Sequence, residues 1–463
     1  MSDTAETLPR RSSPAAGSIT DITNRMERLP LSRWQVKARV LIGTATFFDA
    51  FDALAIAQVL PVLTPLWNLN SAQTGALISV GYLGQLVGAL LFSWIAERRG
   101  RVFAMVLAIA TFSVLSVGCA FSWSFESLLI FRTLQGLGLG GQVPIAAVFI
   151  SEITKAHGRG RFILLYELVF SVGVVVAGLV GFWVVPHLGW EFMFVVGALP
   201  VLSIPLLLKQ LPESPRWLAG VGRETDADRE MSRIEHNVAK AVGSPLPPAG
   251  DLTVAAQRAA SSWTELFRPP YLRRTLVVWS IWFGAYMVYY GISTWLPTLY
   301  RTVFKLPLEV SLQYGLISNC IGLAGAALCA LTIDFVGRRI WFTVALGGSA
   351  VFLFALALSG VHQPSDLMIF GSGAYFFAAA AAIGVYLYTP ELYPTRIRAI
   401  GVGTATAWLR LASMIGPVVI GTFLAYGLTT IFAVFGAVAL VVAVIITVFA
   451  PETKNKVLEE LSS

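Results

Sequence analysis

Twelve long apolar runs constrain the fold of this chain more than any other feature of its sequence. Each is about 20 residues long, the length that a helix needs to cross the hydrocarbon core of a bilayer. Six runs precede a long polar segment and six follow it. They lie at about residues 40–63, 73–95, 102–121, 126–149, 162–184 and 190–208, and at about 275–297, 311–333, 340–359, 367–389, 400–425 and 428–450. We therefore predict an all-α polytopic membrane protein with 12 transmembrane helices in two pseudo-symmetric six-helix halves.

The composition agrees with a chain that lies mostly in lipid. Charged residues make up only 13% of the 463 residues, and the mean hydropathy is +0.72. A soluble globular chain carries roughly 25% charged residues. The three cysteines, Cys119, Cys320 and Cys329, fall within apolar runs without metal-binding spacing. We expect them to be free thiols, and we expect no metal or other cofactor.

The positions of the cations predict how the chain lies across the membrane. Of its 33 Lys and Arg residues, 29 lie in the termini or in loops on one side, and only Arg301 and Lys305 lie in loops on the other. Such an excess marks the cytoplasmic side, here of a bacterial plasma (inner) membrane. It also explains the net charge of +7 without a nucleic-acid partner. The expected parts are a disordered cytoplasmic N-terminus (1–33), an N-terminal bundle (34–209), a cytoplasmic middle loop (210–272), a C-terminal bundle (273–451) and a cytoplasmic tail (452–463).

Two loops recur at equivalent places in the two halves. Each combines an acid, arginines and, after the second helix of each half, a turn glycine. We predict that these residues form gating loops, in which an acid bridges to an arginine on a neighbouring helix. The gating residues are Glu97, Arg98, Gly100, Arg101, Glu152 and Arg159 in the first half, and Asp334, Gly337, Arg338, Arg339, Glu391, Arg396 and Arg398 in the second. Tandem halves with a site between them are a transporter architecture.

Two acids lie in the middle of the first apolar run. Asp49 falls roughly 14 Å along the helix axis, near the midplane of a ~30 Å hydrocarbon layer, and Asp52 is one turn further on the same helix face. A carboxylate at this depth costs a few kcal/mol, and proton or ion handling is a common reason to keep one. The alternative is a structural pair that holds helices together. Glu167, about one turn into the fifth run, is either a further proton site or a partner for loop arginines.

Two arginines also fall inside apolar runs. Arg132 needs a counter-charge or an anionic ligand, and Asp49 or Asp52 is the obvious partner. The arginine would either set the pKa of that aspartate for proton coupling or form a plain structural ion pair with it. Arg410 is the only basic residue within the runs of the second half. We expect it to bind a substrate carboxylate, the alternative being a lock on a neighbouring helix.

Aromatic side chains share one face of the seventh run. Trp282, Tyr286, Tyr289 and Tyr290 recur at three- and four-residue spacing, which suits either a wall against a flat ring or ordinary packing. Gln85 and Asn319 are weaker candidates for substrate binding. Helix packing is the simpler explanation for Gln85, because glycines lie on both sides of it.

The loop motifs resemble those of the major facilitator superfamily over about residues 34–456. Glu97 to Arg101 matches the family's loop pattern, and Pro212 to Leu218 and Pro451 to Lys454 look like sugar-porter signatures. These motifs imply the fold, but many porters of other substrates share them.

Other motifs are more specific within the superfamily. Asp49 and Asp52 resemble the Asp-x-x-Asp of aromatic-acid:proton symporters. The chain is more closely similar to bacterial niacin transporters, in the segments Phe48 to Asp52, Gly136 to Pro144 and Tyr388 to Ala399. Gln142 stands where the niacin carriers tend to have Glu, and we count it as a further candidate for substrate binding. If that Glu moves protons or binds substrate, this chain differs from the niacin carriers in proton coupling or in substrate.

The resemblance implies proton-coupled uptake of a small aromatic carboxylate such as nicotinate by alternating access. Benzoate-type acids or another small metabolite, including a sugar, remain alternatives. A membrane sensor that does not transport is the alternative from another class. We expect no enzymatic activity, since no nucleophile is paired with a buried His, and we expect a monomer whose partners are substrate, protons and membrane lipid.

Overall fold

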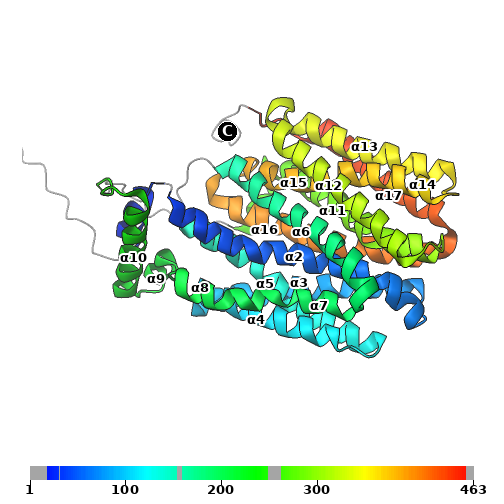
Figure 1. The fold of residues 1–463 in the computed structure, drawn as a ribbon. Helices are drawn as coiled ribbons and strands as arrows, with labels where there is room; N and C mark the ends of the chain where they lie inside the picture. Colours follow the sequence, from blue (N-terminus) through cyan, green and yellow to red (C-terminus); the bar gives the residue numbers. More distant parts are fainter. Residues whose placement is uncertain (1–17, 31, 154–158, 249–261, 455–463) are drawn as a thin grey trace, which may run out of the picture.

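The computed structural model describes residues 18–30, 32–153, 159–248 and 262–454, and these residues contain helices but no strands. The first half consists of α2 (Arg33–Leu66), α3 (Ser71–Arg99), α4 (Arg101–Ala120), α5 (Phe125–Glu152), α6 (Arg159–Leu188), α7 (Glu191–Gly197), η1 (Leu199–Ser203) and α8 (Ile204–Gln210). The second consists of α11 (Tyr271–Thr302), α12 (Leu308–Val336), α13 (Arg338–Ser359), α14 (Pro364–Asp366), η3 (Leu367–Gly371), α15 (Ser372–Glu391), α16 (Thr395–Phe423), η4 (Leu424–Tyr426) and α17 (Leu428–Phe449). The two halves lie side by side (Figure 1).

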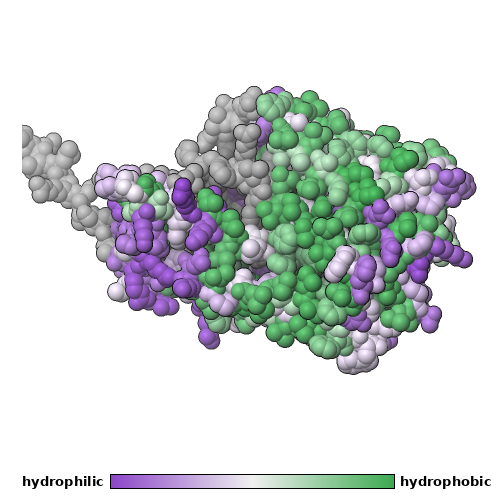
Figure 2. All heavy atoms as spheres, in the orientation of Figure 1, coloured by the Kyte–Doolittle hydropathy of each residue, from purple (hydrophilic) through white to green (hydrophobic). Residues whose placement is uncertain are grey.

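The prediction of twelve membrane-spanning helices is confirmed. Twelve helical segments of the described chain are long and apolar enough to cross a bilayer. The sixth is not one continuous α-helix, because Pro200 and Pro205 lack the N–H that an α-helix interior requires, and a 3₁₀ stretch joins α7 to α8 there. Figure 2 shows an apolar belt between two polar ends. Large apolar side chains such as Leu90, Leu331 and Leu358 are exposed, as expected of a surface that faces lipid.

Glycines allow the helices of the first half to approach one another closely. A Cβ atom added to Gly84 would lie 2.1 Å from the backbone oxygen of Thr133, and one added to Gly140 would lie 2.0 Å from that of Gln85. Only glycine, which has no Cβ atom, fits at these two positions, and small residues are a common feature where membrane helices associate. The α3–α5 crossing is therefore a rigid part of the first half, and it fixes the position of Gln85.

The two halves also meet closely at one end of the bundle. Ser79 Oγ of α3 donates to Met414 O of α16 at 2.8 Å, and a Cβ atom on Gly421 would lie 2.5 Å from Ser71 O. These contacts lie at the end opposite α9 (Pro215–Gly220) and α10 (Glu224–Val242), which we call the closed end. The other end carries the middle loop and is called the loop end.

A small helical cap covers the loop end of the first half. It consists of α1 (Ile19–Glu27), α9 and α10, which bury an apolar cluster that includes Ile22, Met26, Trp217 and Met231. Our expectation of disorder over residues 1–33 is therefore wrong for α1, whose apolar face is covered by α10. Residues 1–17 lie outside the described part of the chain.

One arginine joins the helices of the cap. Arg25 of α1 bonds to Asp228 at 2.6 Å and to Glu235 at 2.7 Å, both on α10, and to Asp21 on its own helix at 3.3 Å. Arg28 bonds to the other oxygen of Glu235 at 2.6 Å. The hydrogen bonds that Arg25 donates to Glu235 are the main reason why the pKa of Arg25 is raised.

Candidate functional site

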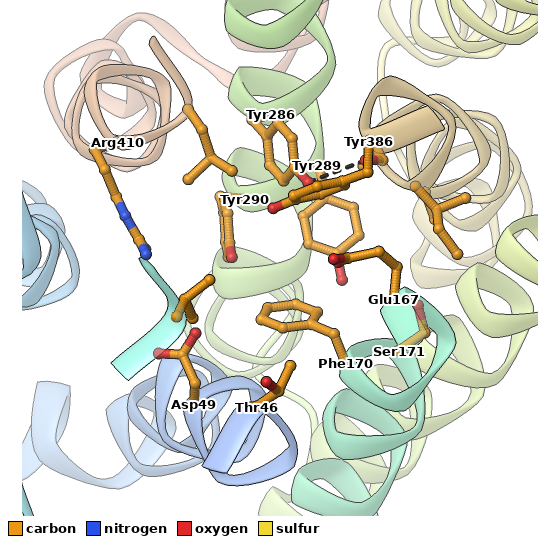
Figure 3. Close-up of a pocket in the computed structure, with 15 residues that line it drawn as sticks. Thr46, Asp49, Glu167, Phe170, Ser171, Tyr286, Tyr289, Tyr290, Tyr386 and Arg410 are labelled. Carbon is orange, nitrogen blue, oxygen red and sulfur yellow. Dashed lines mark hydrogen bonds between the residues drawn. The ribbon is translucent and has the colours of Figure 1, made fainter. Parts of the chain in front are cut away.

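A cavity lies between the two halves at the middle of the bundle, and it contains about 610 Å³ of space that no atom occupies, including the part open to solvent (Figure 3). Its polar lining comes from both halves, with carboxylates from the first half and an arginine and tyrosines from the second. The lining residues are Thr46, Asp49, Val143, Glu167, Phe170, Ser171, Tyr286, Tyr289, Tyr290, Ala379, Ala382, Ile383, Tyr386, Leu409 and Arg410. A site that both halves line is opened or closed when the halves move relative to each other.

Asp49 is the buried acid of α2 that reaches this cavity. Only 3% of the residue is exposed, and its Oδ1 atom has no hydrogen-bond partner among the described residues. Thr46 lies one turn away on the same helix face and also lines the cavity. A buried carboxylate oxygen without a donor is costly, so Asp49 is suited to take up a proton or to meet a polar ligand.

Arg410 lines the cavity from α16, and its guanidinium is directed toward the side that carries Asp49 in Figure 3. Nη1 of Arg410 donates a hydrogen bond to Oε1 of Gln85, which lies on α3 in the other half. No ion pair joins Arg410 to Asp49 in the described structure, although the two charges attract each other across the cavity. The guanidinium therefore keeps donors for an anionic group in the cavity.

Tyrosine rings of the second half form one wall of the cavity. Tyr286 and Tyr290 of α11 stack with ring centroids 5.8 Å apart, and Tyr289 packs edge-on against Tyr290 at 5.1 Å. The hydroxyl of Tyr286 donates to Ala382 O at 3.0 Å, which holds this ring in place. Trp282 stacks behind Tyr286 and donates to Thr389 Oγ1 at 2.8 Å, so it supports the wall without lining the cavity.

Glu167 brings a second carboxylate to the cavity from α6. It lies beside Phe170 and Ser171, one turn along the same helix, and Figure 3 shows it on the side of the cavity below Tyr386. No hydrogen bond or ion pair to its carboxylate is found among the described residues. The cavity thus holds two acids and one arginine, all within reach of a small polar molecule.

The other membrane-embedded acid, Asp52, lies away from the cavity. Its Oδ2 atom accepts from Arg132 Nη1 at 2.9 Å, and its Oδ1 atom accepts from Gln135 Nε2 at 2.7 Å. Asp52 is fully buried and Arg132 is 3% exposed. Of the two partners considered for Arg132, the structure places Asp52 in contact, in the form of a structural ion pair between α2 and α5.

Two further predicted binding residues also lie outside the cavity lining. Asn319 of α12 packs against Gly178 of α6, where the halves touch each other. Gln142 of α5 is 1% exposed, and neither atom of its amide has a hydrogen-bond partner among the described residues. Its neighbour Val143 does line the cavity.

Several lining residues were not predicted from the sequence. Thr46, Phe170, Ser171, Ala379, Ala382, Ile383, Tyr386 and Leu409 are small, apolar or aromatic, and nothing in their type marks them as functional. One signal was available on α15. Ala379, Ala382, Ile383 and Tyr386 recur at three- and four-residue spacing, so small residues share one helix face with a tyrosine.

The two predicted gating loops build the same arrangement at the loop end of each half. In the first half, Arg101 pairs with Glu97 at 3.0 Å and with Glu152 at 3.1 Å, and its backbone N–H donates to Glu213 at 2.9 Å. Gly100, with φ of +107°, makes the turn before it. The sequence reasoning missed Glu213, although it lies in the quoted Pro212 to Leu218 motif.

In the second half, Arg338 pairs with Asp334 at 2.9 Å and with Glu391 at 2.8 Å, and its backbone N–H donates to Glu452 at 2.9 Å. Gly337, with φ of +98°, takes the place of Gly100. Each of these two clusters links helices within one half, and none of the contacts described here crosses to the other.

Three other predicted gating arginines contact other groups through their side chains, while the backbone N–H of Arg339 donates to Glu452 of the second cluster at 3.0 Å. Arg98 packs on Trp94, with 4.1 Å between the guanidinium carbon and the ring centroid. Arg339 donates to Thr447 O, and Arg398 donates to Tyr393 O at 3.2 Å. The side chains of Arg159 and Arg396 lie outside the described part of the structure.

Comparison with known proteins places this geometry among transporters. The family model described as sugar (and other) transporter matches residues 22–463. The chain is 34% identical to the niacin transporter NiaP of Acinetobacter baylyi over 445 residues, which are 95% of this chain and 99% of that protein. It is 29% identical to a gallate transporter of Pseudomonas putida, over 90% of this chain and 91% of that protein.

Solved structures agree on the fold. The structure of the proton:xylose symporter XylE bound to 6-bromo-6-deoxy-D-glucose superimposes with a TM-score of 0.69 at 20% identity. The match covers 93% of this chain and 98% of the symporter chain. At 20% identity the similarity shows only the fold of the twelve helices. The ligand has to be inferred from the residues that line the cavity.

Proposed function

The chain belongs to the sugar (and other) transporter family of the major facilitator superfamily, and from this premise we propose that it takes up a small aromatic carboxylate, with nicotinate as the leading candidate, together with a proton. That it is a secondary transporter and not an enzyme follows from the family. The single observation that supports an aromatic carboxylate and a proton as the transported species is the cavity, in which Arg410 of one half faces Asp49 of the other.

The cavity chemistry supports an aromatic carboxylate. The guanidinium of Arg410 offers a charged, planar pair of donors, which suits a carboxylate better than a neutral hydroxyl group. Tyr286, Tyr289 and Tyr290 offer ring faces and edges to a flat ring. Niacin and gallate, named for the two relatives, share an aromatic ring that bears a carboxylate.

Asp49 and Glu167 support coupling to protons. A carboxylate in this setting is neutral when protonated, so a bound anion and one proton together leave the net charge of the cavity unchanged. The loaded carrier then reorients without moving net charge, and the membrane potential does not oppose entry of the anion. The proton gradient supplies the driving force for accumulation.

The same geometry supports alternating access. The α3–α16 contacts at the closed end have to separate for substrate to enter from that side, and the halves then rock about the cavity. We propose that the loop end faces the cytoplasm of a bacterial inner membrane, because the excess of Lys and Arg lies there, and that the monomer in lipid is the working unit.

Uptake of labelled nicotinate into vesicles that contain the purified protein tests the proposal. We expect accumulation that depends on an inward proton gradient and that stops when the gradient is collapsed. A competition panel of nicotinate, nicotinamide, benzoate, gallate and glucose assigns the substrate. Strong competition by benzoate or gallate alone would favour a benzoate-type acid, and competition by glucose alone would overturn the carboxylate. Binding without any uptake would favour a membrane sensor.

A further inference from the structure

Arg410 is held by a neutral partner. Its Nη1 atom donates to Oε1 of Gln85, and no carboxylate among the described residues lies within ion-pair distance of its guanidinium. Membrane-buried arginines normally sit beside a compensating acid, as Arg132 does beside Asp52 at 2.9 Å in this same protein. The chain therefore treats Arg132 and Arg410 differently. Arg132 is buried beside an acid, whereas Arg410, which is only partly buried, has no acid in direct contact among the described residues.

Gln85 is well placed to hold the guanidinium in one position. Only 2% of the residue is exposed. Its backbone is fixed by the α3–α5 crossing, because Cβ atoms added to Gly136 and Gly140 would lie 3.1 Å from Gln85 N and 2.0 Å from Gln85 O. The amide thus projects from the closely packed α3–α5 crossing toward an arginine of the second half.

We propose that Gln85 is a positioning residue that determines the charge of the ligand which this cavity accepts. Its amide orients Arg410 by a hydrogen bond and leaves the positive charge available for an anionic group of the ligand. This inference rests on the proposed carboxylate substrate. A glutamate at position 85 would bond to Arg410 more strongly but would compensate its charge. An apolar residue would release Arg410 toward Asp49.

A purely structural role for Gln85 makes the opposite prediction. If the amide served only to link α3 to α16, glutamate would be the better replacement, since it keeps the length and the acceptor oxygen and strengthens the contact. Methionine keeps the length but loses the acceptor. Stability and nicotinate binding would then follow the same order among variants, with glutamate above methionine.

The test compares Gln85→Glu and Gln85→Met in the full-length protein purified in detergent. Thermal unfolding gives stability, and equilibrium binding of nicotinate gives the dissociation constant. We expect Gln85→Glu to be at least as stable as Gln85→Met, yet to bind nicotinate about 10–100-fold more weakly than wild type, the range that corresponds to losing one charge-assisted contact. Gln85→Met is expected to lie between wild type and Gln85→Glu in affinity.

The outcomes separate this inference from the proposed function. Nicotinate binding that is weaker in Gln85→Met than in Gln85→Glu, or unchanged in both, would overturn the positioning role while leaving the carboxylate substrate in place. If wild type binds no carboxylate of the competition panel, the proposed function and this inference fall together. Should Gln85→Glu not fold, Gln85→Met combined with Asp49→Asn decides. Restored binding relative to Gln85→Met alone supports the role, because residue 49 then no longer attracts the released Arg410, and unrestored binding contradicts it.

Discussion

Asp52 and Arg132 form a closed ion pair, 2.9 Å from Oδ2 to Nη1, that is sealed within the first half and away from the cavity. Asp49, one helical turn earlier, lines the cavity and forms no ion pair with an arginine among the described residues. Two acids that look alike in the sequence therefore have different surroundings. Substitutions at the two positions should produce different kinds of defect.

We expect Asp52→Asn to damage stability. The substitution leaves Arg132 buried without a full counter-charge, which costs about 3–5 kcal/mol where a partner of a buried pair is removed. Thermal unfolding in detergent measures the loss. The double variant Asp52→Asn/Arg132→Gln removes both charges and should recover much of the stability. A double variant that is no more stable than Asp52→Asn would show that the pair is not the source of the effect.

We expect Asp49→Asn to fold normally and to lose proton-driven accumulation. The amide keeps the shape of the carboxyl group but cannot exchange a proton, so exchange of labelled nicotinate across the vesicle membrane should continue. Uptake against a gradient and counterflow measure the two properties separately. Glu167→Gln is the companion variant, and the same pattern there instead of at Asp49 would assign the proton site to Glu167. Full accumulation in both variants would refute proton coupling through this cavity.

Arg410→Gln should weaken nicotinate binding by about 10–100-fold, because it removes the charged donor and keeps a polar side chain of shorter reach. Arg410→Lys should restore only part of the affinity, since an ammonium group lacks the planar pair of donors. Arg98→Gln is the matched control, because Arg98 packs on Trp94 far from the cavity lining. Unchanged affinity in Arg410→Gln would remove this residue from the binding site.

Gly100→Ala and Gly337→Ala should each destabilise the protein by about 1–2 kcal/mol or more, the cost of a positive φ for a residue with a Cβ atom. The new Cβ would also lie 2.3 Å from Glu213 Oε2 and 2.8 Å from Glu452 Oε2, respectively. Gly347→Ala is the control, since Gly347 lies within α13 and nothing lies within 4 Å of its added Cβ. Thermal unfolding of the three variants tests this, and equal values for all three would contradict the strain argument.

Arg25→Ala should loosen the cap, because the arginine bonds to two acids of α10. Loss of such a charge-assisted contact costs about 1.5–3 kcal/mol. Faster amide hydrogen exchange over α1 and α10, without a change in α13, is the expected result. Arg229→Ala is the control on the exposed face of α10, where the side chain is 70% exposed. Similar exchange in wild type and Arg25→Ala would mean that the apolar contacts alone hold the cap.

The same cap should weaken in acid. Burial by itself raises the pKa of Glu235, but the bonds from Arg25 and Arg28 outweigh it, so its pKa lies below 4.5. A lowered pKa in the folded state means that this carboxylate contributes stability above pH 4.5 and loses the contribution as the pH falls through the lower value. Exchange over α10 measured from pH 7 to pH 3 checks the direction. Glu235→Gln should remove most of the dependence.

The twelve helices and the two repeated loops could be predicted because they depend on local pattern. A run of apolar residues of bilayer length has few alternatives in lipid, and a glycine flanked by an acid and an arginine marks a tight turn. Helix α1 escaped prediction because its nine residues are stabilised by contacts with α10, about 200 residues later in the chain.

The site could be predicted in part. Asp49, Glu167, Arg410 and the tyrosines of α11 stood out because charge or aromatic clustering is unusual in a membrane helix. Which acid meets the cavity depends on how α2 is rotated against α5, which tertiary packing decides. The partnership of Gln85 with Arg410 joins residues 325 positions apart, and no local signal reports it.

The matching clusters around Arg101 and Arg338 allow a comparison within a single polypeptide. Five corresponding groups, a turn glycine, an arginine and three acids, recur with distances that agree closely. An unequal response of the two copies to the same substitution would then report asymmetry in the working cycle, since the two copies share the same turn, arginine and acid contacts and differ in Glu97 against Asp334.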